Sequence, residues 1–118
     1  MTTLSTSDVL DHHLNSFANY DLAGVMADYS SDAVLSTPAG PLRGLAQIKP
    51  LFQDLVSEFA KPGSSFTMHH RSIDGDHGYI LWTAETGENS YEFATDTFVV
   101  RNGKIVAQSF AAKVKRKC

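Results

Sequence analysis

Hydrophobic residues in the first third of the chain recur with the period of an amphipathic helix. Positions i, i+3, i+4 and i+7 form one apolar face, made of Leu10, His13, Leu14 and Phe17. Thr6 or Ser7 is expected to cap the start of this helix, because a hydroxyl oxygen accepts a hydrogen bond from a free backbone N–H group. Asp21 is expected to cap a second, shorter helix that runs from Leu22 to about Tyr29.

A third helix is predicted after Gly44, where apolar residues again keep helical spacing up to Phe59. Pro50 lies inside this pattern and has no backbone N–H, so we expect either a kink or a later helix start. The run Lys61-Pro62-Gly63 is expected to end the helix.

The remainder of the chain alternates in the manner of β-strands. Strands are predicted over residues 33–37, 65–73, 79–86 and 91–101, with a turn over residues 38–41. Alternation in the second of these strands places Phe66, Met68 and His70 on one face. Asn102-Gly103 is a strong hairpin signal and leads to a last strand that begins at Lys104.

Three helices followed by long antiparallel strands indicate the α+β class. The chain has 118 residues, so a single domain over residues 1–118 is expected. Such a sheet covers one face with the helices, and curling around them leaves a concave space. That arrangement commonly holds a ligand pocket.

Composition and charge exclude several classes of protein. Apolar residues make up 42% of the chain, and no apolar run approaches the roughly 20 residues of a membrane span. The net charge is −3, and four of the 10 basic residues lie in a tail over residues 113–118. The acidic remainder argues against nucleic acid as a partner. We expect the tail to be solvated, with contact to an acidic partner as the alternative, and a cytoplasmic location.

Four short motifs follow one another along the chain: Asn19-Tyr20-Asp21-Leu22, Tyr29 with Asp32-Ala33, Gly44 with Ile48 and Leu51-Phe52, and Asp96 with Phe98 before the Asn102-Gly103 hairpin. In this order they resemble motifs of the nuclear transport factor 2-like superfamily, which includes SnoaL-like polyketide cyclases and ketosteroid isomerases. The likeness spans roughly residues 8 to 112.

This resemblance implies a cone-shaped α+β barrel, in which a strongly curved, mixed but mainly antiparallel sheet wraps three N-terminal helices around an apolar pocket. Members include enzymes, binding modules and assembly domains, so the resemblance implies fold more firmly than function. A homodimer is expected, with an outer sheet face formed by Phe93, Thr95, Thr97 and Val99 as the interface.

Asp96 is the first candidate for catalysis. It lies within an apolar strand, where a carboxylate is costly unless it is paired or protonated. The resemblance implies a role for it, because the matching Asp of the steroid isomerases faces the pocket as a protonated acid, kept neutral by its apolar surroundings. The alternative is an Asp that faces solvent or a dimer partner.

His13 is the second candidate, because it lies on the apolar face of the first helix and matches the position of the isomerases' catalytic tyrosine. An imidazole there could donate a hydrogen bond or transfer a proton near neutral pH. The alternative is a core histidine bound to a backbone carbonyl. The isomerases' proton-moving Asp is replaced here by Thr37, so steroid isomerisation by the usual mechanism is not expected.

The remaining site residues are expected to contact the ligand, namely Tyr29, Trp82, Phe98, His70 and Phe52. Trp82 and Tyr79 lie on opposite faces of one strand, so only one of them can line the pocket. A solvated or interface position is the alternative for His70.

No spacing of the histidines predicts a metal site, and no cofactor is expected.

The candidate site residues and the family resemblance leave two functions open. The first is a cofactor-free acid–base isomerase, cyclase or dehydratase that acts on a small apolar ring compound. The second is a non-catalytic protein that binds such a compound or serves as a dimeric assembly module.

Overall fold

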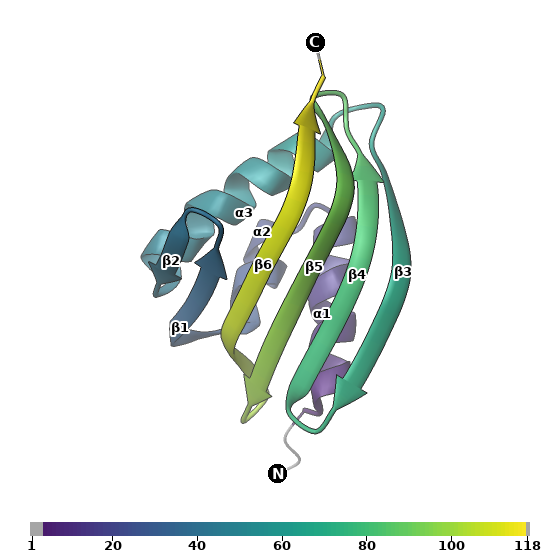
Figure 1. Ribbon diagram of the computed structural model, residues 1–118. Helices are drawn as coiled ribbons and strands as arrows, with labels where there is room; N and C mark the ends of the chain where they lie inside the picture. Colours follow the sequence, from purple (N-terminus) through teal and green to yellow (C-terminus); the bar gives the residue numbers. More distant parts are fainter. Residues whose placement is uncertain (1–3, 118) are drawn as a thin grey trace.

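The computed structural model describes residues 4–117 and arranges them as three helices against one six-stranded sheet (Figure 1). Helix α1 spans Thr6–Ala18 and begins one or two residues earlier than expected, because its cap is Ser5 and not Thr6 or Ser7. The Ser5 hydroxyl accepts from the Asp8 backbone N–H over 3.0 Å, and the Asp8 carboxylate accepts from the Ser5 N–H over 3.2 Å. This reciprocal pair is a capping box.

Helix α2 spans Leu22–Ala27 and is shorter than predicted, because Asp28 caps its end and Tyr29 already belongs to a strand. The prediction that Asp21 caps its start is confirmed, since the Asp21 carboxylate accepts from the Gly24 N–H over 3.0 Å. The end of α2 thus places Asp28 and Tyr29 directly beside helix α1.

Helix α3 spans Leu45–Ala60 and includes Pro50, so the alternative of a later start is wrong. Gly44 precedes it with φ of 78°, a left-handed conformation that favours glycine. The helix directs Ile48, Phe52 and Phe59 into the core.

The sheet has the order β2-β1-β6-β5-β4-β3, in which β1 and β6 are parallel and every other pair is antiparallel. Its strands are β1 (Tyr29–Thr37), β2 (Gly40–Arg43), β3 (Ser65–Asp74), β4 (His77–Glu85), β5 (Asn89–Arg101) and β6 (Lys104–Arg116). Strand β2 was not predicted. It is a short edge strand that contains Pro41, and an edge tolerates proline because one side of the strand needs no partner.

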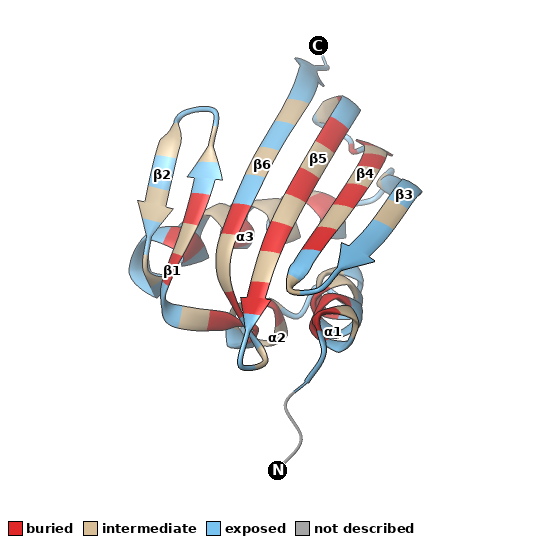
Figure 2. Ribbon diagram, turned by 60° about the horizontal axis from the view of Figure 1, so that its bottom comes forward, coloured by how far each residue is buried: buried red, intermediate tan, exposed pale blue. Residues whose placement is uncertain are grey.

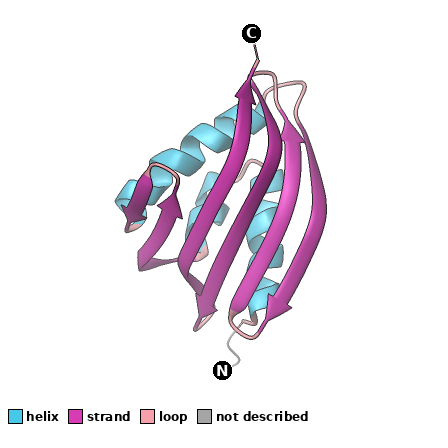
Figure 3. Cartoon of the chain, viewed as in Figure 1, coloured by secondary structure: helices cyan, strands magenta, loops and turns pink. Residues whose placement is uncertain are grey.

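The sheet is curved and open, and the helices cover its concave face (Figure 3). Buried and less buried residues alternate along β4 and β5 (Figure 2), as expected of strands with one face on the core. The predicted α+β class with three helices on a curved, mixed sheet is therefore confirmed.

The basic segment that begins at residue 113 forms the end of the last strand of the sheet. Strand β6 continues to Arg116, and Lys113 lies opposite Phe93 in the ladder with β5. Lys117 donates from its ammonium to the backbone carbonyl of Thr86 over 2.7 Å. The side chains of residues 113–117 are exposed, as expected of a solvated segment, but the backbone is not frayed because the β5 ladder pairs it as far as Arg116. No helix among the described residues is long and apolar enough to cross a membrane.

Candidate functional site

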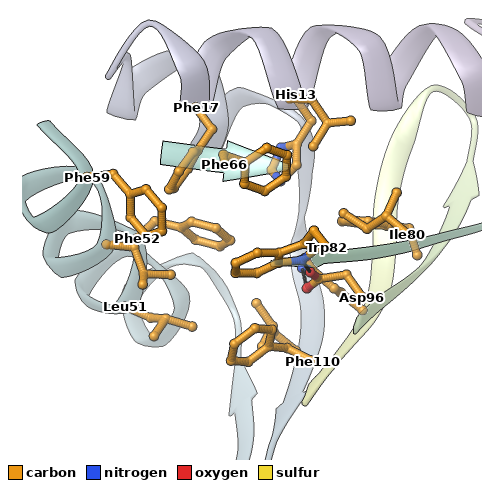
Figure 4. A pocket seen from close by; sticks show the side chains of 15 residues that line it. His13, Phe17, Leu51, Phe52, Phe59, Phe66, Ile80, Trp82, Asp96 and Phe110 are labelled. Carbon is orange, nitrogen blue, oxygen red and sulfur yellow. Dashed lines mark hydrogen bonds between the residues drawn. The ribbon is translucent and has the colours of Figure 1, made fainter. Parts of the chain in front are cut away.

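An apolar cavity of about 80 Å³ lies between the helices and the concave face of the sheet (Figure 4). Its walls come from α1, α3 and five strands, and are formed by His13, Leu14, Phe17, Leu35, Leu51, Phe52, Leu55, Phe59, Phe66, Ile80, Trp82, Asp96, Phe98, Gln108 and Phe110. Among these lining residues, His13 and Asp96 are the two with ionisable side chains.

Asp96 reaches the cavity from the inward-facing positions of β5, between Ala94 and Phe98. Its carboxylate accepts two hydrogen bonds of 2.9 Å, one from Nε1 of Trp82 and one from Nε2 of Gln108. Burial raises the pKa of Asp96 above its ordinary value, and these two donors and the His13 imidazole act in the opposite direction. The carboxyl group is therefore buried, satisfied and closer to neutral pH in its titration than a surface Asp.

His13 enters the cavity from the buried face of α1. Its Nδ1 lies 3.1 Å from Oδ2 of Asp28, and its Nε2 lies 3.4 Å from the hydroxyl of Tyr29. The imidazole also packs edge-on against Phe52 and Phe98, with ring centroids 5.8 and 5.7 Å apart. Because Nδ1 faces a carboxylate, the Asp28 side chain orients the ring and favours a proton on Nδ1.

Tyr29 does not line the cavity, although we expected it to contact the ligand. It lies behind the lining residues, where its hydroxyl donates to Oε1 of Gln108. Burial raises the pKa of Tyr29 well above its ordinary value, and the nearby carboxylates of Asp96 and Asp28 raise it further. Tyr29 is thus held as a neutral phenol that links His13 to Gln108.

The structure places Trp82, Phe98 and Phe52 on the cavity wall and Tyr79 on the opposite face of β4. Figure 4 shows the Trp82 indole and Asp96 pointing toward one another, with Phe52 across the cavity.

His70 lies outside the cavity, and the expectation that it shares a face with Phe66 and Met68 is wrong. The register of β3 against β4 shifts between Met68 and His70, so a bulge at this point reverses the alternation. The His70 ring instead lies 6.1 Å from that of Tyr79, on the outer face of the sheet.

Thr37 has a local structural role. Its hydroxyl accepts from the Ala39 N–H over 3.2 Å and donates to the Gly40 carbonyl over 2.8 Å, which closes the turn between β1 and β2. Both hydrogen bonds stay within the turn.

Two polar residues of the site were missed by sequence reasoning, Asp28 and Gln108. A regular hairpin at Asn102-Gly103 would place Ala107 opposite Phe98, because Arg101 pairs with Lys104. The register instead shifts by one residue at Val99, so Gln108 takes that position and reaches Asp96. The sequence contains no clear signal for this shift. For Asp28 there was a signal. It is a carboxylate at the end of the second, short helix, which returns the chain to the first helix, where His12 and His13 are adjacent.

A second, wider groove of about 400 Å³ borders the cavity. The two spaces share Leu14, Phe17, Phe59 and Phe66 as a common wall. Phe66 is 44% exposed on the edge strand β3, so its side chain is the least confined part of this wall. Among residues 4–117, no cluster of three or more His, Cys, Asp or Glu side chains is arranged to hold a metal ion.

Residues 10–108 match the model of the SnoaL-like domain. No curated protein sequence matches the chain.

Solved structures with the same fold include an NTF2-like protein of unknown function from Cytophaga hutchinsonii, with 11% identity over 95% of this chain and 93% of that one and a TM-score of 0.73. A proposed ketosteroid isomerase from Kribbella flavida is 13% identical over 98% of this chain and 84% of that one, with a TM-score of 0.76. An LEH-like epoxide hydrolase from M. tuberculosis is 19% identical over 94% of this chain and 84% of that one, with a TM-score of 0.71. At these identities the likeness shows the fold alone.

Proposed function

The chain belongs to the SnoaL-like domain family, and from that premise we propose that its cavity binds a small apolar ring compound and moves a proton on it, with Asp96 and His13 as the acid–base pair. The observation that carries this proposal is the position of these two ionisable side chains on the wall of an otherwise apolar space. Ionisable groups held in such a space are enriched at catalytic sites.

The chemistry of each group suits general acid–base catalysis. A carboxyl group whose pKa is raised by burial retains its proton nearer to neutral pH than a surface Asp, so it can both accept and return a proton. The imidazole of His13, oriented by Asp28, would polarise a carbonyl or hydroxyl group of the ligand. Isomerisation, aldol-type cyclisation and dehydration all use such a pair, and none of them requires a cofactor.

The size of the cavity limits the ligand. Ligand pockets commonly measure roughly 300–1,000 Å³, and the cavity here measures about 80 Å³. We therefore expect a compound with a single ring, which enters from the neighbouring groove as the exposed Phe66 side chain turns aside.

Hydrogen exchange at a ketone tests this activity without knowledge of the natural substrate. In D₂O near neutral pD, the protein is expected to accelerate loss of the α-proton signal of cyclohexanone in ¹H NMR spectra. The Asp96→Asn variant is expected to lose about 100-fold of that acceleration, which is a common contribution of one general acid or base. Glu92→Gln is the matched control, because Glu92 is a carboxylate of the same strand that lies on the exposed surface.

Binding is measured in parallel with phenol as the probe. Trp82 is the single tryptophan and its indole lies on the cavity wall, so its fluorescence is expected to change as phenol binds. A fluorescence change without any acceleration of exchange would favour the alternative function, a non-catalytic binding protein. The replacement of the isomerases' Asp by Thr37, which is engaged in a turn, is the observation that favours this alternative. If millimolar phenol leaves the Trp82 fluorescence unchanged and the exchange of cyclohexanone is not accelerated, the cavity is not a ligand site.

We also propose that the protein forms a homodimer through the outer face of the sheet. Phe93 is 51% exposed on this face, and Thr95, Thr97 and Val99 follow it along β5. Exposed aromatic side chains on a face of small and β-branched residues are typical of subunit interfaces. Light scattering at micromolar concentrations is expected to give twice the monomer mass. The Phe93→Asp variant is expected to have a mass closer to that of the monomer. A monomer mass for the unaltered protein would contradict the proposal.

A further inference from the structure

A continuous chain of buried hydrogen bonds joins Asp96 to His13 and continues to Asp28. Nε2 of Gln108 donates to Oδ1 of Asp96 over 2.9 Å, and the Tyr29 hydroxyl donates to Oε1 of Gln108. The same hydroxyl lies 3.4 Å from Nε2 of His13, whose Nδ1 lies 3.1 Å from Oδ2 of Asp28. Each of these five residues is at most 8% exposed.

The direction of each donor limits which protonation states the chain can hold. Nδ1 of His13 carries a proton, because it faces the carboxylate of Asp28. The Tyr29 hydroxyl has a single proton to donate, and that proton is used toward Gln108. Nε2 of His13 must then be the donor to the Tyr29 oxygen. In this first arrangement His13 is an imidazolium and Asp96 is a carboxylate.

A second arrangement satisfies every group equally well. If the Gln108 amide turns by half a rotation, Oε1 faces Asp96 and Nε2 faces the Tyr29 oxygen. A protonated Asp96 then donates to Oε1, and the Tyr29 hydroxyl is free to donate to an unprotonated Nε2 of His13. The two arrangements hold the same number of protons and differ in the position of one, which lies on Nε2 of His13 in the first and on Asp96 in the second.

The other two combinations of protonation states leave at least one hydrogen-bonding group of the chain without a suitable partner. If His13 is neutral while Asp96 is charged, Nε2 of His13 and an oxygen of Gln108 compete for the one Tyr29 proton. If both His13 and Asp96 are protonated, two donors face each other at one of the links. An unpaired or opposed polar group at a buried site is costly, so these states are disfavoured.

We propose that His13 and Asp96 share one proton through Tyr29 and Gln108, and that the Gln108 amide turns when the proton changes sides. Gln108 and Tyr29 are thus positioning residues that make the protonation of one partner depend on the other. Interacting groups of this kind titrate as a pair, with two steps that belong to both residues.

Few other charges face this chain. Asp28 contacts His13 from the junction of α2 and β1, and His12 contacts the second oxygen of Asp28, with Nδ1 and Oδ1 2.7 Å apart. Trp82 from β4 donates to Asp96 in both arrangements. Helix α3 contributes Phe52, which does not ionise, to the wall beside His13.

The sharing itself is a property of the ligand-free protein, and only its use in catalysis rests on the proposed function. In that use, Asp96 removes a proton from the ligand, and Nε2 of His13 exchanges its long 3.4 Å contact with Tyr29 for a ligand oxygen and delivers its proton there, which converts the first arrangement into the second. Return of both protons regenerates the first arrangement and completes an isomerisation, so a reaction with paired proton removal and delivery is the class that fits.

NMR titration of the ligand-free protein tests the sharing. The expected result is that the Asp96 carboxyl carbon and the His13 ring nitrogens change at the same two pH midpoints, and that the Gln108 side-chain NH₂ signals change with them. In Gln108→Met each residue is expected to show one main midpoint of its own, displaced by about one pH unit from the wild type, which is the scale of such coupling. Gln53→Met is the control, because Gln53 is exposed on α3.

Two results would overturn the proposal. One is a wild-type titration in which the Gln108 NH₂ signals stay fixed while Asp96 changes. The other is a Gln108→Met variant with unaltered titration curves at His13 and Asp96. Should Gln108→Met fail to fold, the wild-type titration still decides the matter. Absence of ketone exchange in a protein that retains the coupled titration would instead contradict only the proposed function.

Discussion

Two carboxyl groups flank the contact between the rings of Trp82 and Tyr91, whose centroids are 5.6 Å apart. The Trp82 indole donates to Asp96, and the Tyr91 hydroxyl donates to Glu58 over 2.9 Å. Both carboxyl groups are bound by side chains of the sheet, yet their surroundings differ. Asp96 faces an apolar cavity, whereas Glu58 lies at a partly exposed position near the end of α3.

The hydrogen bonds to Glu58 connect helix α3 to the hairpin of β4 and β5. Thr86 donates its hydroxyl over 2.6 Å and Asn89 donates its side-chain amide over 3.0 Å, in addition to the Tyr91 hydroxyl. Burial, and then the hydrogen bond to Glu58, raise the pKa of Tyr91, so this hydroxyl remains a donor at all moderate pH values. Asp96 has two N–H donors and a pKa that burial raises. Glu58 thus connects α3 to the β4–β5 turn, whereas the raised pKa of Asp96 comes from its burial at an apolar cavity.

The largest effect on stability is expected at Glu58. Glu58→Ala removes the acceptor of three side-chain donors, one of which belongs to the fully buried Thr86. We expect a loss of about 2 kcal/mol in the free energy of unfolding, measured with urea, because hydrogen bonds to charged groups contribute roughly 1.5–3 kcal/mol.

The matched control is Glu88→Ala, which removes an exposed ion pair with Lys61. Solvent screens such exposed pairs, so they contribute little to stability. If Glu58→Ala costs no more than Glu88→Ala, the carboxylate of Glu58 does not fasten α3 to the hairpin.

A smaller effect is expected at Asp96, and it depends on pH. Because the pKa of Asp96 is higher in the folded protein than in the unfolded chain, its favourable contribution is complete below about pH 4. That contribution is lost as the pH rises through the folded-state pKa. The wild type is therefore expected to lose stability relative to Asp96→Asn as the pH rises above about 4 in urea titrations. A difference between the two proteins that is constant over this range would show that burial does not oppose ionisation of Asp96.

The periodicity of the chain predicted the elements and the faces of most of them. Asp96 and Trp82 lie on inward-facing positions because β4 and β5 alternate regularly near the cavity. His13 follows from the 3.6-residue period of α1, which no bulge or proline interrupts. Local pattern, together with the family resemblance, was enough to name these residues as candidates, but the structure was needed to decide that Trp82 rather than Tyr79, and Asp96 rather than a solvent-facing Asp, lines the cavity.

The errors arose where the register between two strands decides the outcome. A shift beside His70 moves that residue to the outer face, and a shift at Val99 brings Gln108 beside Asp96. One extra residue in a strand reverses every side chain beyond it, and neither shift is marked by a glycine or proline. Tyr29 lies behind the cavity wall for a similar reason, since its position depends on how β1 pairs with β6.

The parallel pairing of β1 with β6 has a consequence for the order of folding. Tyr29 lies opposite Ile105 in this ladder, so the two strands come together only after a long intervening segment has been synthesised. Contacts between such distant residues form late and slowly, because closing a long loop costs entropy before any contact compensates for it. During synthesis, β3 and β4 are made before Gln108, which lies on the last strand. The proton-sharing chain would then be among the last parts of the molecule to assemble, and a partly synthesised chain would have an unpaired edge on β5 until β6 arrives.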